Sequence, residues 1–179
     1  MPMLAYVFWH QPHPDTARTD YEAKLKAFHK ALGQRAHAFR LSTAPWAPDG
    51  ACYEDWYLIK NSAELDPLND AAVSGMRRDP HNAVAAHTAW GAAGLYHLRL
   101  GVEKLKTARH AVWFAKPRDT SYDSLYDRLG PLCEITPAML WQRFMVLGPT
   151  PEFCFLSSRK VDLMDIVEQP VYIDLDPIL

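Results

Sequence analysis

The chain has 179 residues, with 19 lysines and arginines against 21 aspartates and glutamates, and its formal net charge is −2. Hydrophobic residues make up 49% and aromatic residues 12% of the chain, which excludes an intrinsically disordered protein and predicts a substantial core. The balanced charge offers no general attraction to nucleic-acid phosphates or to anionic membrane surfaces.

Neither export nor membrane insertion is expected. The longest early apolar run covers residues 4–9, whereas a membrane-spanning helix needs about 20 apolar residues. The three cysteines (Cys52, Cys133 and Cys154) are few, odd in number and far apart, which does not predict a disulfide framework. We therefore expect a cytoplasmic protein with reduced thiols and with no membrane or nucleic-acid partner.

The first part of the chain predicts the order strand, helix, strand, strand, helix, strand. Aromatic and β-branched residues favour strands over residues 4–10, 37–41, 52–59 and 94–100. The first helix is indicated by a capping-box pattern from Thr19 to Glu22, by apolar residues at helical spacing, and by Gly33 as its end. The Asp-Pro pairs at 66–67 and 79–80 predict a second helix in two pieces, broken near Gly75.

The same order of elements then repeats in a shortened form. Strands are predicted over residues 111–116, 139–146, 152–156 and 171–175. A helix is predicted from Thr120 to Gly130, and only a short helix, over residues 158–167, precedes the last strand. We therefore predict an α+β fold of two tandem βαββαβ repeats, residues 1–105 and 106–179.

A βαββαβ repeat is the ferredoxin-like arrangement, in which both helices cover one face of an antiparallel sheet. Two such sheets packed face to face would cover each other, and in this the chain resembles the dimeric α/β-barrel superfamily in a tandem-repeat form. That superfamily includes cofactor-free monooxygenases, ethyl tert-butyl ether degradation proteins, stress-responsive barrel proteins and haem-binding relatives of chlorite dismutase. The run from Tyr53 to Tyr57 is similar to a bacterial family of this group that has no assigned activity.

Strand alternation divides the residues of the first repeat between two faces. One face is apolar and is expected to lie under the helices: Ala5, Val7, Phe39, Leu41, Trp56, Leu58, Leu98 and Leu100. The other face mixes aromatic and charged residues and is expected to face the second sheet: Tyr6, Phe8, His10, Arg40, Ser42, Asp55, Tyr57, His97 and Arg99. Buried charges need partners, so this mixed face must pair internally, hold water or bind a ligand.

Two interpretations of the mixed face stay open. In the first, Arg40, Asp55 and Arg99 form a structural ion-pair network, and the protein is a non-catalytic ligand-binding or self-assembling protein. In the second, the face lines a pocket for a small molecule, with His10 as the general acid or base and with seven ligand-binding residues: Tyr6, Phe8, Arg40, Asp55, Tyr57, His97 and Arg99.

The second interpretation predicts chemistry that needs no cofactor. Two arginines suit an anionic group, and the aromatic side chains suit a flat ligand. The activity would then be a monooxygenase, isomerase or lyase reaction on a small aromatic or anionic compound. The histidine and cysteine spacing predicts no metal site, and neither His87 nor His97 has a context that indicates a haem ligand, so no cofactor is expected. A homodimer stays open as the assembly.

Overall fold

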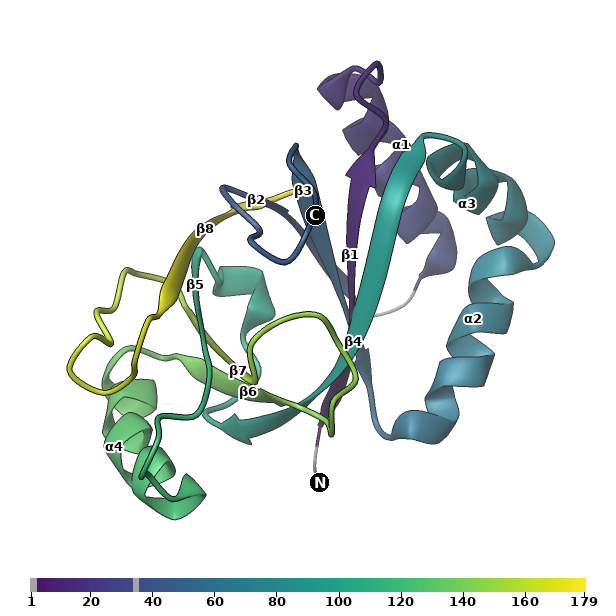
Figure 1. Cartoon of the computed structure of the whole chain (residues 1–179). Helices are drawn as coiled ribbons and strands as arrows, with labels where there is room; N and C mark the ends of the chain where they lie inside the picture. The colour runs from purple at the N-terminus through teal and green to yellow at the C-terminus, as the bar shows by residue number, and fades with distance from the viewer. Residues whose placement is uncertain (1–2, 34–35) are drawn as a thin grey trace.

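The computed structural model describes residues 3–33 and 36–179, which form a closed antiparallel barrel with α-helices on its outside (Figure 1). The strands are β1 (Leu4–Pro12), β2 (Ala36–Leu41), β3 (Cys52–Ile59), β4 (Thr88–Leu100), β5 (His110–Phe114), β6 (Met139–Arg143), β7 (Phe153–Ser157) and β8 (Val171–Pro177). The helices are α1 (Arg18–Leu32), α2 (Leu65–Val73), α3 (Arg78–Ala85) and α4 (Tyr122–Ile135). None of the helices in the described residues is long and apolar enough to cross a membrane.

The strand order shows how the two halves of the chain combine. Around the barrel the order is β1-β3-β2-β8-β5-β7-β6-β4, so the first half contributes β4-β1-β3-β2 and the second half β8-β5-β7-β6. The halves pair at both edges, through β2 with β8 and through β4 with β6. The two sheets expected to pack face to face are therefore opposite walls of one barrel, and pairing removes their free edges.

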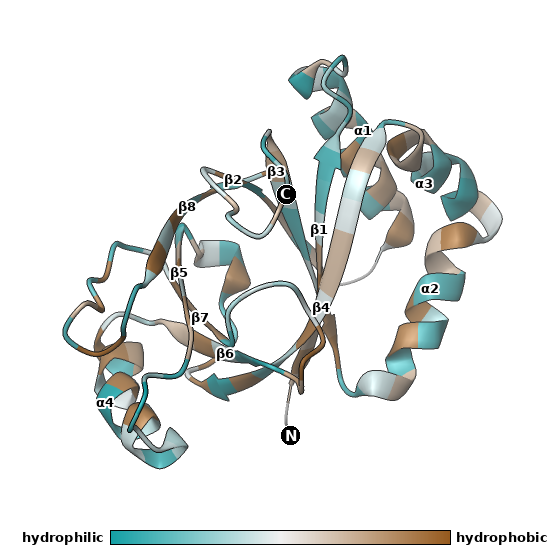
Figure 2. Cartoon of the chain, in the orientation of Figure 1, coloured by the Kyte–Doolittle hydropathy of each residue, from teal (hydrophilic) through white to brown (hydrophobic). Residues whose placement is uncertain are grey.

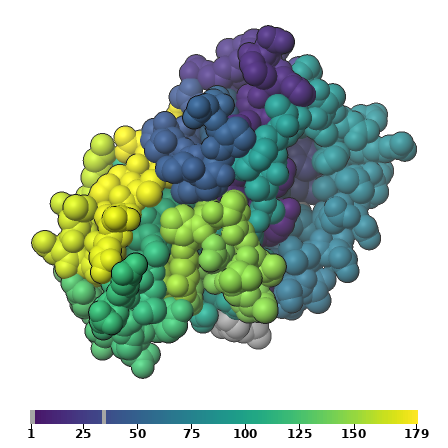
Figure 3. All heavy atoms as spheres, viewed as in Figure 1, coloured from purple at the N-terminus to yellow at the C-terminus, as the bar shows by residue number. Residues whose placement is uncertain are grey.

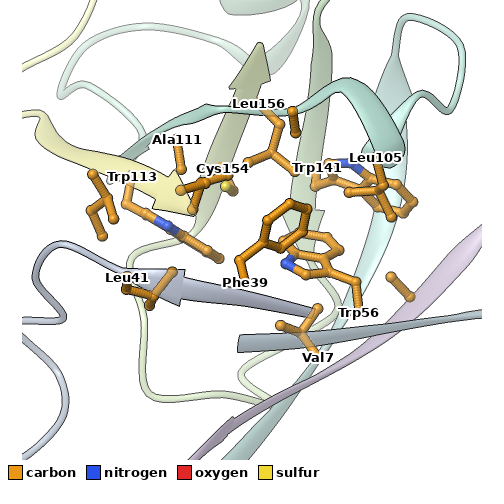
Figure 4. Packing of buried hydrophobic residues seen from close by; sticks show 14 of the residues in the cluster. Val7, Phe39, Leu41, Trp56, Leu105, Ala111, Trp113, Trp141, Cys154 and Leu156 are labelled. Carbon is orange, nitrogen blue, oxygen red and sulfur yellow. The ribbon is translucent and has the colours of Figure 1, made fainter. Parts of the chain in front are cut away.

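The apolar face of the strands fills the barrel interior. Val7, Phe39 and Trp56 are at most 1% exposed and meet Trp113 and Trp141 from the second half (Figure 4). The expectation that this face lies under the helices was wrong. A closed barrel has an interior from which water is excluded on all sides, so the most apolar face is buried there, and the mixed face lies outside, toward the helices.

The helices cover the outside of the barrel in two groups. Helices α1, α2 and α3 lie together over the first half, whereas α4 lies over the second half (Figure 1). Each helix carries both hydrophobic and hydrophilic residues, as expected for a helix with one buried face (Figure 2). The loop between β6 and β7 lies on the surface against β4, where Leu95 N–H donates to the carbonyl of Leu147 at 3.0 Å (Figure 3).

Three local expectations were wrong. Helix α1 begins at Arg18 after Ala17, which makes no side-chain cap, so the pattern from Thr19 to Glu22 is not a capping box. Helix α4 continues through Gly130 to Ile135, because Leu129 and Cys133 gain burial on both sides of that glycine. Residues 158–167 form turns instead of a helix, although Leu163 and Val167 within them are buried.

Candidate functional site

A pocket of about 540 Å³ lies between the outer face of the sheet and helices α1, α2 and α3. Strands β1 and β3 supply five of the predicted site residues to its wall: Tyr6, Phe8, His10, Asp55 and Tyr57. The opposite wall is largely apolar and includes Leu25 and Phe28 of α1 and Leu68 of α2. No lysine or arginine from the described ranges, 3–33 and 36–179, lines the pocket.

Asp55 is the centre of the polar part of the pocket. Its side chain is 2% exposed, and its Oδ2 accepts hydrogen bonds from His29 Nε2 at 3.0 Å and from the Tyr57 hydroxyl at 3.1 Å. His10 Nε2 lies 3.4 Å from the same oxygen. Burial opposes ionisation of this carboxyl, but the two histidines outweigh it and hold the pKa of Asp55 well below its ordinary value. The cluster is therefore a buried, ionised carboxylate between two imidazoles.

A chain of hydrogen bonds determines the protonation of His10 Nδ1. The Thr88 hydroxyl donates to the carbonyl of Val84 at 3.0 Å, so its single proton is used there. The Tyr21 hydroxyl, 2.9 Å from Thr88 Oγ1, must then donate to Thr88. Tyr21 is consequently left to accept from His10 Nδ1, 2.7 Å away. His10 therefore carries a proton on Nδ1 when every contact of this chain is satisfied.

This assignment leaves Nε2 as the atom of His10 at which a further proton can bind. Nε2 lies 3.4 Å from the ionised Oδ2 of Asp55, so a proton bound there would form an ion pair with this carboxylate at the wall of the pocket. Burial also raises the pKa of the Tyr21 and Tyr57 hydroxyls, so both stay protonated as donors.

The other three predicted site residues lie away from this pocket. Arg40 of β2 forms an ion pair with Asp176 of β8. Arg99 donates to Gln142 Oε1 at 2.7 Å, and the His97 ring lies against Phe144 with a centroid separation of 4.7 Å. The expected cluster of His10, Arg40 and Arg99 between the two sheets is therefore wrong. All three lie on the outside of the barrel, and Arg40 and Arg99 belong to its two seams, one beside β8 and one beside β6.

Sequence reasoning missed His29 and Tyr21, which complete the site from α1. The apolar residues at helical spacing that predicted this helix form one buried stripe: Tyr21, Leu25, Phe28 and Leu32. His29 follows Leu25 by four residues and so lies on the same stripe. A histidine at that position was the available signal that α1 presents a polar group to the sheet.

Glu54, the neighbour of Asp55 in β3, points to the opposite side and is fully buried inside the barrel. Its carboxyl accepts from the indole N–H of Trp9 at 2.7 Å and from that of Trp56 at 2.5 Å. Burial, partly offset by these two hydrogen bonds, raises the pKa of Glu54 to about 7. Strand β3 therefore carries two consecutive buried acids, one inside the barrel and one under the helices.

No group of three or more histidine, cysteine, aspartate or glutamate side chains in the described part of the chain is arranged to hold a metal ion. The histidines considered as haem ligands do not fit that role. His87 Nδ1 lies 3.5 Å from Thr16 Oγ1, His97 packs against Phe144, and neither lines the pocket.

No protein-family model matches the sequence, and no curated protein matches it significantly. The fold is similar to that of a candidate monooxygenase from Lactobacillus acidophilus NCFM, with a TM-score of 0.62 and 8% identity, covering 100% of this chain and 95% of that chain. A candidate chlorite dismutase has a TM-score of 0.52 at 8% identity, over 99% of this chain and 96% of that chain. A mutant of the chlorite dismutase from Candidatus Nitrospira defluvii has a TM-score of 0.50 at 11% identity, over 99% and 92%. These proteins belong to the dimeric α/β-barrel superfamily, and at such identities the likeness concerns the fold alone.

Proposed function

We propose that this protein binds a small aromatic molecule in the pocket beneath α1–α3 and transfers a proton to or from it through His10 and Asp55. The observation that carries the proposal is a buried His10–Asp55–His29 cluster at the wall of a largely apolar pocket. Buried ionisable groups with perturbed pKa values at a cleft are typical of sites of acid–base chemistry.

The reaction class we propose is cofactor-independent oxygenation, isomerisation or elimination. Each of these begins with the removal of a proton from the substrate. Unprotonated His10 Nε2 accepts this proton, Nδ1 keeps its own proton on Tyr21, and the Asp55 carboxylate, 3.4 Å from Nε2, stabilises the imidazolium that forms. The similarity in fold to a candidate monooxygenase is compatible with the first of the three. Arg40 and Arg99 do not reach the pocket, so the geometry favours an aromatic over an anionic substrate.

A ligand screen with a matched pair of variants tests the proposal. Ala72 of α2 lines the pocket, whereas the next residue, Val73, is 43% exposed and does not. Compounds that bind should raise the melting temperature of the wild type and of Val73→Trp, but not that of Ala72→Trp, in which the new indole occupies the pocket. Ligand-dependent oxygen consumption would then identify an oxygenase. Compounds that stabilise all three proteins equally would contradict binding in this pocket.

The second candidate function is a non-catalytic, self-associating barrel protein, and one observation favours it. Met145 and Val146 in the loop between β6 and β7 are 72% and 81% exposed, although apolar side chains of this size are more often buried. A homodimer through this loop would appear in sedimentation velocity as a species of twice the mass that Val146→Asp dissociates.

Two further proposals concern the internal repeat of the chain and the cellular compartment of the protein. The strand orders β4-β1-β3-β2 and β8-β5-β7-β6 support a tandem ferredoxin-like repeat, divided at residues 1–105 and 106–179. Cys52, Cys133 and Cys154 are free and buried, which supports a cytoplasmic location.

A further inference from the structure

Three hydrogen-bond donors around Asp55 are engaged. The Thr88 hydroxyl donates to Val84, the Tyr57 hydroxyl donates to Asp55 Oδ2, and His10 Nδ1 donates to Tyr21. A ligand that can only accept hydrogen bonds therefore finds no free donor among these groups.

Three atoms of the same cluster are buried without a hydrogen-bond partner: Asp55 Oδ1, His29 Nδ1 and His10 Nε2. Asp55 Oδ1 is buried without a hydrogen bond, while Oδ2 takes the contacts of His29, Tyr57 and His10. His29 donates through Nε2, so its Nδ1, also buried without a partner, carries a lone pair. Asp55 lines the pocket and His29 does not, so a ligand that donates a hydrogen bond would pair with Oδ1 and recover the cost of leaving this acceptor unpaired.

The charge of the pocket adds a second restriction. Its charged lining residues are Asp55 and Asp66, and within residues 3–33 and 36–179 it has no lysine or arginine. A carboxylate ligand would lose its hydration and face the carboxylates of Asp55 and Asp66 without one of these cations to offset the repulsion. The pocket should therefore reject anions.

We propose that the pocket selects small aromatic molecules that carry an uncharged hydrogen-bond donor, a hydroxyl or an amino group, and that Asp55 Oδ1 accepts this hydrogen bond. The aromatic body would lie against Phe8, Phe28 and Tyr57. This inference rests on the proposed function, because it names the substrate class of the same pocket.

Four probes of similar size test the inference on the full chain: phenol and aniline, which donate; anisole, which only accepts; and benzoate, which is anionic. Affinities are measured at pH 7 by chemical-shift titration of the protein. Phenol and aniline should bind roughly tenfold or more tightly than anisole, and benzoate should bind least. Equal affinities, or tighter binding of benzoate, would overturn the donor preference while leaving the pocket as a binding site. Failure of all four probes to bind would overturn the proposed function as well.

Substitution of the acceptor gives a sharper test. In Asp55→Asn the amide oxygen is needed by His29 and Tyr57, which places the NH₂ group where Oδ1 was. The preference should then reverse, so that acetophenone, which only accepts, gains over phenol. Asp70→Asn makes the same change at an exposed residue of α2 outside the pocket and should leave the preference unchanged. A preference that survives Asp55→Asn, or that disappears in Asp70→Asn, contradicts the assignment to Asp55. The ranking in the wild type decides the inference even if Asp55→Asn fails to fold.

Discussion

Glu54 should make the stability of this protein depend on pH. The pKa of this fully buried carboxyl is about 7 in the folded chain, against an ordinary value of 4.5. Because the folded value is the higher one, the stabilisation that depends on the neutral carboxyl is complete below pH of about 4.5, decreases as the pH rises, and is lost above about 7. At about 1.4 kcal/mol for each pH unit, the loss amounts to roughly 3 kcal/mol.

Glu54→Gln separates this effect from the hydrogen bonds. The amide can accept from the indole of Trp9 or of Trp56 but places an N–H opposite the other, so the variant should be about 1–3 kcal/mol less stable than the wild type at pH 5. The amide of the variant does not titrate, whereas the wild type loses stability as Glu54 ionises. The difference in unfolding free energy between the two proteins should therefore narrow by about 2–3 kcal/mol between pH 5 and pH 8. Cysteines and acids elsewhere in the chain are common to both proteins and cancel in this difference.

The assay is urea denaturation of both proteins at pH 5, 6, 7 and 8, followed by circular dichroism. Glu134→Gln, at an exposed position of α4, controls for the removal of one negative charge. A free-energy difference between wild type and Glu54→Gln that stays constant from pH 5 to pH 8 would refute the reasoning, because the carboxyl would then have the same protonation in the folded and unfolded chain.

Three other predictions follow from the packing. Trp56→Ala should cost about 3–5 kcal/mol of unfolding free energy, because Trp56 is fully enclosed by the barrel. Tyr57→Ala should cost less, because that side chain already borders the pocket. Denaturant melts that rank the two variants in the opposite order would contradict the assigned faces. Tyr21→Phe removes the acceptor of His10 Nδ1 and should cost about 1–3 kcal/mol and shift the ring ¹⁵N resonances of His10, whereas unchanged resonances would contradict the hydrogen-bond chain. A fragment of residues 1–105 leaves the edges of β2 and β4 unpaired and should aggregate or self-associate; a monomeric, cooperatively folded fragment would show that barrel closure is not required.

The order of elements could be predicted from the sequence because most strands have local signals. Strand β3 has the bounds expected from its aromatic and β-branched residues, and the break near Gly75 separates α2 from α3 as expected. Alternation also divided β1 and β3 into the correct two sets of residues. It could not say which set lies inside, because β3 is buried on both faces and each face carries one acid, Glu54 or Asp55, among apolar and aromatic residues.

The site was partly predictable for the same reason. Five predicted residues share the pocket because they belong to one set of alternating positions on β1 and β3. Arg40 and Arg99 lie on the same face of the sheet but on β2 and β4. Arg40 pairs with Tyr53 at the level of His10 but lies two strands away from it, and Arg99 lies beyond the end of the β1–β4 pairing at Leu4 and His97. Their partners, Asp176 and Gln142, come from the second half of the chain, and nothing local in the sequence indicates that β8 and β6 lie beside β2 and β4.

The two halves of the barrel place different chemistry under their helices. In the first half the outer face presents His10 and Asp55 to α1, and α2 and α3 leave a pocket above them. In the second half the outer face presents Phe114, Phe153 and other apolar side chains, which α4 buries completely. Gln142 of β6 is a buried polar residue at the edge of this cluster, and its side-chain oxygen accepts from Tyr126 of α4 and from Arg99 of β4. The second half also supplies the β8 and β6 partners that close the barrel. The residues of the site thus all come from the first half of the chain, whereas the closed sheet that positions β1 and β3 also needs the strands of the second half.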